Sequence, residues 1–278
     1  MKIAWRTFAD LTSVCRANLD RVRALSPDVI VGIPRSGMVP ASILATSLGL
    51  PLVDLHTFCD GYEWGISGHY RPIGSVTRVL LVDDASGYGR TMSAAVERLA
   101  AERPDTVVMP CAVYADPEAS PRFALAMERL TKPRLFEWNW WRSGKLAHCC
   151  VDIDGVICRD PTSEQKRDPE AYRKFIASTP LLYKPVKRVG AFVTGRSSNC
   201  RAETEAYFQR HGIAYGALAM REGDRLTRTV EAHAEHKAAF YRKSNAALFI
   251  ESDERQAEMI ARLARKPALC IETGKLWA

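Results

Sequence analysis

Two adjacent carboxylates follow an apolar run in the first third of the chain. Residues 79–82 are Val-Leu-Leu-Val, and Asp83 and Asp84 come next, followed by a loop that contains Gly87 and Gly89. Glycines let backbone N–H groups converge on one point, and the start of a following helix adds its positive dipole, which favours a phosphate site. Carboxylates would repel that phosphate, so the sequence predicts that they hold neutral hydroxyls, such as a sugar diol.

A second loop lies about 50 residues upstream. The apolar run 29–33 ends in Pro34, Arg35, Ser36 and Gly37. Alone, either loop would fit an ordinary strand end with a helix-capping residue. Together they resemble the two ligand-binding segments of the type I phosphoribosyltransferases, which use phosphoribosyl pyrophosphate (PRPP), and the resemblance covers residues 15–135.

This resemblance implies a role for each residue. Asp83 and Asp84 would hold the ribose hydroxyls and favour positive charge on the ring during transfer. Arg35 and backbone amides would face the pyrophosphate, and the glycine loop would bind the 5-phosphate. The family's Thr-Thr-Gly is Gly87-Tyr88-Gly89 here, so hydroxyl donors are missing from that loop. The implied PRPP-binding residues are Arg35, Ser36, Gly37, Asp83, Asp84, Gly87, Tyr88, Gly89, Arg90 and Thr91.

The second half carries another ordered set of polar residues, expected at strand ends, where α/β sheets place their sites. Within this set, Lys237 is expected at the start of a helix, and Glu251 is expected as the first residue after a strand. The set is Asp152, Asp154, Thr194, Gly195, Lys237, Glu251 and Asp253. In this order, over residues 148–278, it resembles the haloacid dehalogenase-like phosphohydrolases.

By this second resemblance, Asp152 would be a nucleophile that forms an aspartyl-phosphate, and Asp154 would be the acid and then the base. Thr194, Gly195 and Lys237 would hold phosphate oxygens. Mg²⁺ would be bound by Asp152, the backbone carbonyl of Asp154, and Glu251, with Asp253 as the second candidate. Arg196 and Arg201 would either contact the substrate or be solvated charges, and His233 and His236 are expected on the surface.

Strands alternate with helices in both halves, which predicts two α/β domains, each a mostly parallel sheet covered by helices. We expect a phosphoribosyltransferase domain over residues 1–136, a Trp-rich junction over 137–147, and a Rossmannoid phosphatase domain over 148–278. The short insert 155–188 would form a small cap that leaves the second site open.

Composition limits the remaining choices. The net charge is +7, but no Lys/Arg cluster is interleaved with aromatic residues, so no nucleic-acid partner is expected. The eight cysteines form no C-x-x-C pair, which predicts reduced thiols and a cytoplasmic protein. The longest uncharged stretch, residues 36–53, is broken by proline and glycine, so no membrane span is expected.

These observations give one leading hypothesis. The enzyme would transfer 5-phosphoribose from PRPP to a glycan or lipid-linked glycan, with Mg²⁺, and then remove the 5-phosphate to leave a ribofuranosyl unit. The alternatives are an orotate- or purine-type phosphoribosyltransferase with an accessory phosphatase, and a PRPP-sensing regulator. A monomer and a homo-oligomer both remain open.

Overall fold

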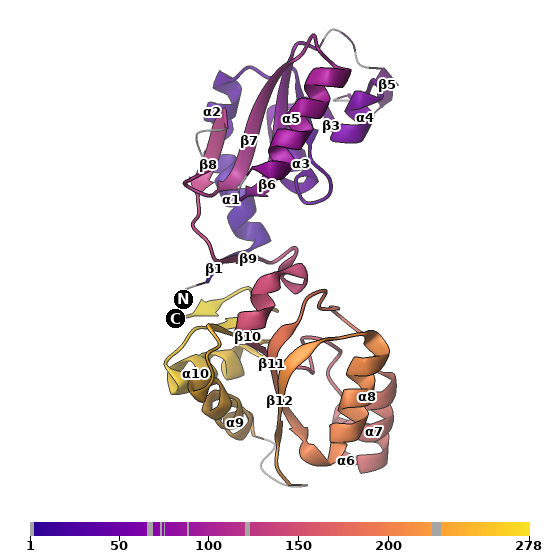
Figure 1. Ribbon diagram of the computed structural model, residues 1–278, viewed down its shortest axis with the longest axis vertical. Helices are drawn as coiled ribbons and strands as arrows, with labels where there is room; N and C mark the ends of the chain where they lie inside the picture. The colour runs from indigo at the N-terminus through magenta and orange to yellow at the C-terminus, as the bar shows by residue number, and fades with distance from the viewer. Residues whose placement is uncertain are drawn as a thin grey trace. The chain divides into compact units, whose positions relative to one another are not determined.

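The chain folds as two units, seen in the computed structural model (Figure 1). The structure describes residues 3–65, 69–72, 74, 76–87, 89–119, 123–223 and 229–278. The N-terminal unit is Arg6–Arg134, and the C-terminal unit is Met1–Trp5 with Leu135–Ala278. The chain passes between them within strands β1 (Ala4–Arg6) and β9 (Arg134–Phe136), which pair with each other.

The N-terminal unit is built on a seven-stranded sheet in the order β5-β4-β3-β2-β6-β7-β8. Strands β3, β2, β6, β7 and β8 are parallel to their neighbours, and β4 and β5 form an antiparallel hairpin at one edge. The strands are β2 (Val29–Gly32), β3 (Leu52–Asp54), β4 (Tyr62–Trp64), β5 (Tyr70–Pro72), β6 (Arg78–Ser86), β7 (Val107–Ala115) and β8 (Leu125–Arg129).

Helices cover this sheet, as the alternating sequence pattern predicted. They are α1 (Phe8–Ala17), α2 (Leu19–Ala24), α3 (Met38–Leu48), α4 (Leu55–Cys59) and α5 (Arg90–Glu102). Helix α5 buries Met92 and Leu99 against β2 and β6 in one hydrophobic cluster. Helix α3 ends at Gly49, whose positive φ of 65° suits a glycine cap. The expected strand 79–82 is longer than predicted, since β6 continues through both aspartates to Ser86.

The C-terminal unit has a six-stranded sheet in the order β12-β11-β10-β13-β14-β15, parallel except for β15. The strands are β10 (Cys149–Val151), β11 (Val189–Ser197), β12 (Tyr215–Arg221), β13 (Leu248–Glu251), β14 (Ala268–Cys270) and β15 (Leu276–Trp277). Leu248 and Ile250 join one hydrophobic cluster and Phe249 another, as strand alternation requires.

Helices lie on both faces of this second sheet (Figure 1). They are α6 (Ser163–Arg167), α7 (Pro169–Ser178), α8 (Arg201–His211), α9 (Val230–Lys243) and α10 (Glu254–Ala264), with short 3-10 turns at Trp140–Arg142, Gly144–His148 and Ser198–Cys200. The insert 155–188 supplies only α6 and α7. Trp140, in the predicted junction, is buried in the core of this unit beside Tyr183.

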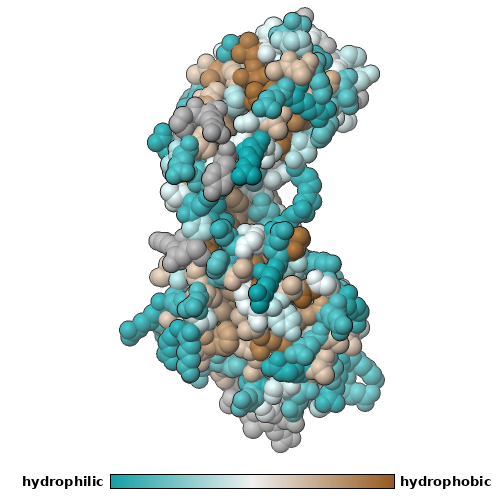
Figure 2. Space-filling view, viewed as in Figure 1, coloured by the Kyte–Doolittle hydropathy of each residue, from teal (hydrophilic) through white to brown (hydrophobic). Residues whose placement is uncertain are grey.

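The face of the molecule in Figure 2 carries many hydrophilic residues, with smaller hydrophobic areas among them. Trp64 and Val186 are among the large apolar side chains that are at least half exposed. Within the described part of the chain, none of the helices has both the length and the apolar character needed to cross a membrane.

Candidate active sites

The loop after β2 packs directly against the backbone of β6. The Ile33 amide donates a hydrogen bond to the Val82 carbonyl over 2.9 Å. A Cβ atom on Gly37 would lie 2.5 Å from the Ile33 carbonyl oxygen and 2.7 Å from that of Val82. Only glycine therefore fits here, and its close approach brings Arg35 and Ser36 beside the strand that carries the two aspartates.

This position is also a topological switch point. From β2 the sheet continues to β3 on one side and to β6 on the other. Ligands of open α/β sheets bind in the crevice that forms beyond the carboxyl ends of the strands at such a point. The two loops that the sequence singled out follow β2 and β6, the strands at this switch point.

Asp83 and Asp84 are both buried, 8% and 5% exposed. Burial and the neighbouring Asp84 raise the pKa of Asp83 to about 8. The Asp84 amide donates to the Asp83 carboxylate over 2.9 Å, which orients that side chain. A carboxyl with a raised pKa in this position suits hydroxyl groups and developing positive charge far better than a bare phosphate.

The glycine loop leads into α5 in the predicted manner. Gly89 caps the helix with a φ of 75°, a left-handed conformation that favours glycine, and Arg90 and Thr91 are exposed in the first turn. Tyr88 lies outside the described residues.

Sequence reasoning missed two neighbours of the glycine loop. A Cβ on Gly87 would lie 3.4 Å from the ammonium nitrogen of Lys132, which is 3.5 Å from the Asp116 carboxylate. Asp116 follows β7 and Lys132 follows β8, so both come from the same carboxyl edge of the sheet as Asp83. Neither Lys132 nor Asp116 belongs to a recognisable sequence motif. Only the order of the strands in the sheet could have predicted that they lie near the glycine loop.

The C-terminal unit has its own switch point between β10 and β13, and a buried charge cluster lies there. The Lys237 ammonium donates to Asp152 over 2.7 Å, to Glu251 over 2.6 Å and to Gln256 over 2.8 Å. Burial alone would lower the pKa of Lys237, but the Asp152 and Glu251 carboxylates raise it above its ordinary value. Burial raises the pKa of Glu251 to about 8, against the lowering effect of Lys237.

Two elements differ from the prediction here. Lys237 lies in the middle of α9, not at its start, and Glu251 is the last residue of β13, not the first residue beyond it. The residues are nevertheless brought together, because α9 packs against the sheet face next to β10 and β13.

Asp154 makes a different contact. Both of its carboxylate oxygens accept hydrogen bonds from Arg196, over 2.6 to 3.2 Å. Arg196 is the eighth residue of β11 and is 1% exposed. Arg196 therefore does not reach a substrate, and its charge is not exposed to solvent on a helix. Arg201 is such a solvent-exposed helix charge, since its side chain is partly exposed and pairs with Glu205 one turn along α8.

Thr194 and Gly195 also lie on β11, and two histidines of α9 are close to them. A Cβ on Gly195 would lie 2.0 Å from Nδ1 of His233, so glycine is needed for this approach. Burial lowers the pKa of both His233 and His236. The prediction that these histidines are surface residues is wrong, because both are half-buried against β11.

Asp253 has a structural task. Its side chain accepts a hydrogen bond from the Gln256 amide over 2.8 Å and caps α10. Glu251, in contrast, accepts from the amides of Ser252 and Asp253 as well as from Lys237. Among the residues that the structure describes, no group of three His, Cys, Asp or Glu side chains could hold a metal ion.

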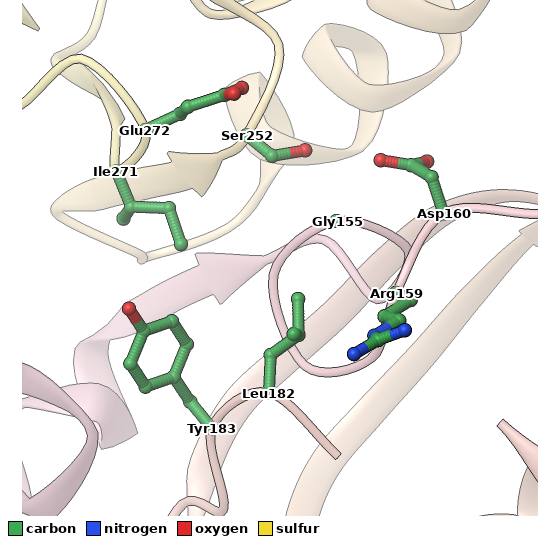
Figure 3. A pocket seen from close by; sticks show the side chains of 8 residues that line it. All are labelled: Gly155, Arg159, Asp160, Leu182, Tyr183, Ser252, Ile271 and Glu272. Atoms are coloured by element: carbon green, nitrogen blue, oxygen red, sulfur yellow. The ribbon is translucent and has the colours of Figure 1, made fainter. Parts of the chain in front are cut away.

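Ser252, the residue after Glu251, lines an open pocket of about 430 Å³ (Figure 3). Gly155 and Ser252, which follow β10 and β13, line it together with Asp160, Tyr183 and Glu272. The Ser252 hydroxyl is 3.5 Å from the Asp154 carbonyl oxygen, so the loops after β10 and β13 meet at the pocket wall.

Comparison with known families gives a match in the first half of the chain. A family model described as "Phosphoribosyl transferase domain" matches residues 11–144. This segment contains all seven strands of the N-terminal sheet. The match supports a phosphoribosyltransferase domain in this part of the chain, and the matched segment is slightly less than half of the chain. No curated protein matches the chain significantly.

Several solved structures are similar to part of this chain. A purine phosphoribosyltransferase from Pyrococcus horikoshii Ot3 is 23% identical with a TM-score of 0.38, over 50% of this chain and 95% of that one. A xanthine-guanine-hypoxanthine phosphoribosyltransferase from Helicobacter pylori is 14% identical with a TM-score of 0.39, over 49% and 91%. An orotate phosphoribosyltransferase from Aeropyrum pernix is 15% identical with a TM-score of 0.32, over 43% and 66%. Because the sequence identities and TM-scores are low, these structural similarities add nothing to the family match.

Proposed function

We propose that the protein transfers 5-phosphoribose from PRPP to a glycan or lipid-linked glycan and then removes the 5-phosphate. The observation that carries the first step is the buried Asp83–Asp84 pair beside the Gly37 loop. An acceptor hydroxyl oxygen bonds to the anomeric carbon, the bond from that carbon to pyrophosphate breaks, and the hydroxyl proton leaves to solvent. Asp83 and Asp84 hold the ribose and stabilise positive charge that develops on its ring.

The second step belongs to the C-terminal unit, as a haloacid dehalogenase-like phosphatase. An Asp152 oxygen bonds to phosphorus while the bond to the ribose 5-oxygen breaks, and Asp154 gives that oxygen a proton. Water, deprotonated by Asp154, then releases phosphate from Asp152. The support is the Lys237 ammonium, 2.7 Å from Asp152, which would hold a phosphate oxygen beside the nucleophile.

The oxygen ligands near Asp152 fit Mg²⁺. Asp152 and Glu251 supply two carboxylates to one ammonium, which leaves one net negative charge when all three ionise. The Asp154 carbonyl oxygen is 3.5 Å from the hydroxyl of Ser252, the residue after Glu251, and it is the third oxygen ligand that we propose. These residues would hold Mg²⁺, which neutralises phosphate charge when it is bound. Asp253 is the weaker candidate ligand because it caps α10.

The size of the insert supports a large acceptor. The regular structure of residues 155–188 consists of the helices α6 and α7. Helix α6 has only five residues. A cap of this size leaves room for a phosphate that is attached to a glycan chain. We also propose that the protein acts in the cytoplasm, where PRPP would be available to the transfer step.

Mass spectrometry of the products tests this proposal. The full chain is incubated with PRPP, Mg²⁺ and a panel of glycan and nucleobase acceptors. Wild-type protein is expected to add a ribosyl unit to a glycan, whereas Asp152→Asn should accumulate the phosphoribosyl adduct, heavier by one phosphate. The same product mass from both proteins contradicts the phosphatase step. Transfer only to a nucleobase would instead establish the orotate- or purine-type alternative.

A further inference from the structure

Arg196 is a buried cation whose described hydrogen-bond partners all lie inside the C-terminal unit. Its side chain is 0% exposed. The Nε and one terminal nitrogen donate to Asp154, that same terminal nitrogen contacts the Cys158 sulfur at 3.2 Å, and the other donates to Thr204 over 3.3 Å. The guanidinium is thus held from several directions and cannot reach a substrate phosphate.

Asp154 lies between the buried Arg196 guanidinium and the solvent-exposed part of the candidate phosphatase site. The Asp154 side chain is 15% exposed, whereas that of Arg196 is fully buried. The Tyr172 hydroxyl of α7 and the Cys158 thiol also approach its two oxygens, at 3.5 and 3.4 Å. A fork of donors on both oxygens fixes the plane of a carboxylate, which a single contact cannot do.

We infer that Arg196 is a positioning residue that holds Asp154 in the orientation needed to protonate the leaving oxygen of the phosphate ester. This inference rests on the proposed phosphatase function. A buried ion pair is weak evidence for stability alone, because an apolar pair of similar volume often serves as well. Here one partner borders the site and carries the proposed proton transfer, so the geometry favours a role in that step.

The test compares two phosphate esters. Ribose 5-phosphate has an alkoxide leaving group that needs a proton, whereas 4-nitrophenyl phosphate has a stable leaving anion that does not. The kcat/KM values report only the steps up to loss of the leaving group, so later hydrolysis of the phosphoenzyme does not enter. In Arg196→Lys and Arg196→Gln, kcat/KM for ribose 5-phosphate should fall by about 100-fold, the lower end for general acid catalysis. The value for 4-nitrophenyl phosphate should fall less than about 10-fold.

The ratio of the two values is taken on one preparation, so a partly unfolded fraction cancels. Arg242→Met, at an exposed position in the last turn of α9, is the matched control and should leave the ratio unchanged. In the Asp154→Asn background, loss of Arg196 should cause no further change in the ratio, because Arg196 acts through Asp154.

The outcomes separate the inference from the function on which it rests. If wild-type protein hydrolyses neither ester, the phosphatase function is wrong and the inference is overturned with it. If wild-type protein is active but Arg196→Lys slows both esters equally, only the inference is overturned, and Arg196 has a structural role. If loss of Arg196 changes the ratio of the two kcat/KM values further in the Asp154→Asn background, the inference is likewise overturned and Arg196 has a structural role.

Discussion

Replacing Asp83 with Asn should stabilise the N-terminal unit while abolishing transfer from PRPP. In the folded protein, burial and Asp84 raise the pKa of Asp83 from 3.8 to about 8. The substitution keeps the shape of the side chain and an oxygen that can accept from the Asp84 amide. It removes the ability of this side chain to become charged when positive charge develops in the site, so stability and activity should move in opposite directions.

The size of this effect follows from linkage. Below pH 3.8 the carboxyl is protonated in both the folded and unfolded chains, and the substitution has little effect. Between pH 3.8 and about 8 the unfolded chain releases the proton while the folded protein keeps it, so the free energy of unfolding falls as the pH rises. At about 1.4 kcal/mol for each pKa unit, the loss at pH 7 is about 4 kcal/mol. Asp83→Asn should recover that amount at pH 7 and less than about 1 kcal/mol at pH 4.

Urea unfolding at several pH values measures this difference. Five of the six tryptophans lie in the C-terminal unit, so a circular dichroism transition without a matching fluorescence change belongs to the N-terminal unit. Asp105→Asn, at an exposed position in the same unit, is the control. An Asp83→Asn protein that is less stable than wild type at pH 7, or equally stabilised at pH 4 and pH 7, would refute the argument.

Three further predictions concern the other site residues. Lys237→Met should lower the free energy of unfolding of the C-terminal unit by about 3–5 kcal/mol, measured by tryptophan fluorescence, because two buried carboxylates lose their cation; Lys243→Met, exposed at the end of α9, should change it little. Gly37→Ala should cost about 1–3 kcal/mol in urea unfolding and weaken PRPP binding in calorimetry, since its methyl group meets two backbone carbonyls. Phosphatase assays should show that Glu251→Gln needs far more Mg²⁺ than Asp253→Asn, because Asn remains a good cap for α10; the reverse order would assign the ligand to Asp253.

Much of the fold followed from short-range patterns in the sequence. The apolar run at 29–33 contains β2, and the helix expected after the glycine loop is α5, because apolar runs and glycine caps are decided within a few residues. Strand ends were harder to place. Asp83, Asp84 and Glu251 are inside strands, since their backbones keep pairing with the neighbouring strand although their side chains are polar.

The partners of the site residues could not be predicted in the same way. Arg196 stands beside Thr194 in a motif, but its contact with Asp154 spans 42 residues and depends on β10 and β11 being neighbours. Lys132 reaches Gly87 only because β7 and β8 follow β6 across the sheet. Such contacts are fixed by strand order, which residue spacing alone does not contain.

The two candidate sites share one layout but differ in how their charges are balanced. Each has acidic residues at the carboxyl edge of a parallel sheet, at a switch point. In the C-terminal unit, buried Lys237 and Arg196 hold the carboxylates of Asp152 and Asp154, so an anionic phosphate can approach without facing two bare charges. At Asp83, the influences on the carboxyl are burial and another acid, which keep its pKa high until positive charge arrives. A site of this second kind is suited to a ring that becomes cationic during the reaction, and a site of the first kind to a phosphate that is already anionic. The difference in charge therefore supports glycosyl transfer in one unit and phosphate removal in the other.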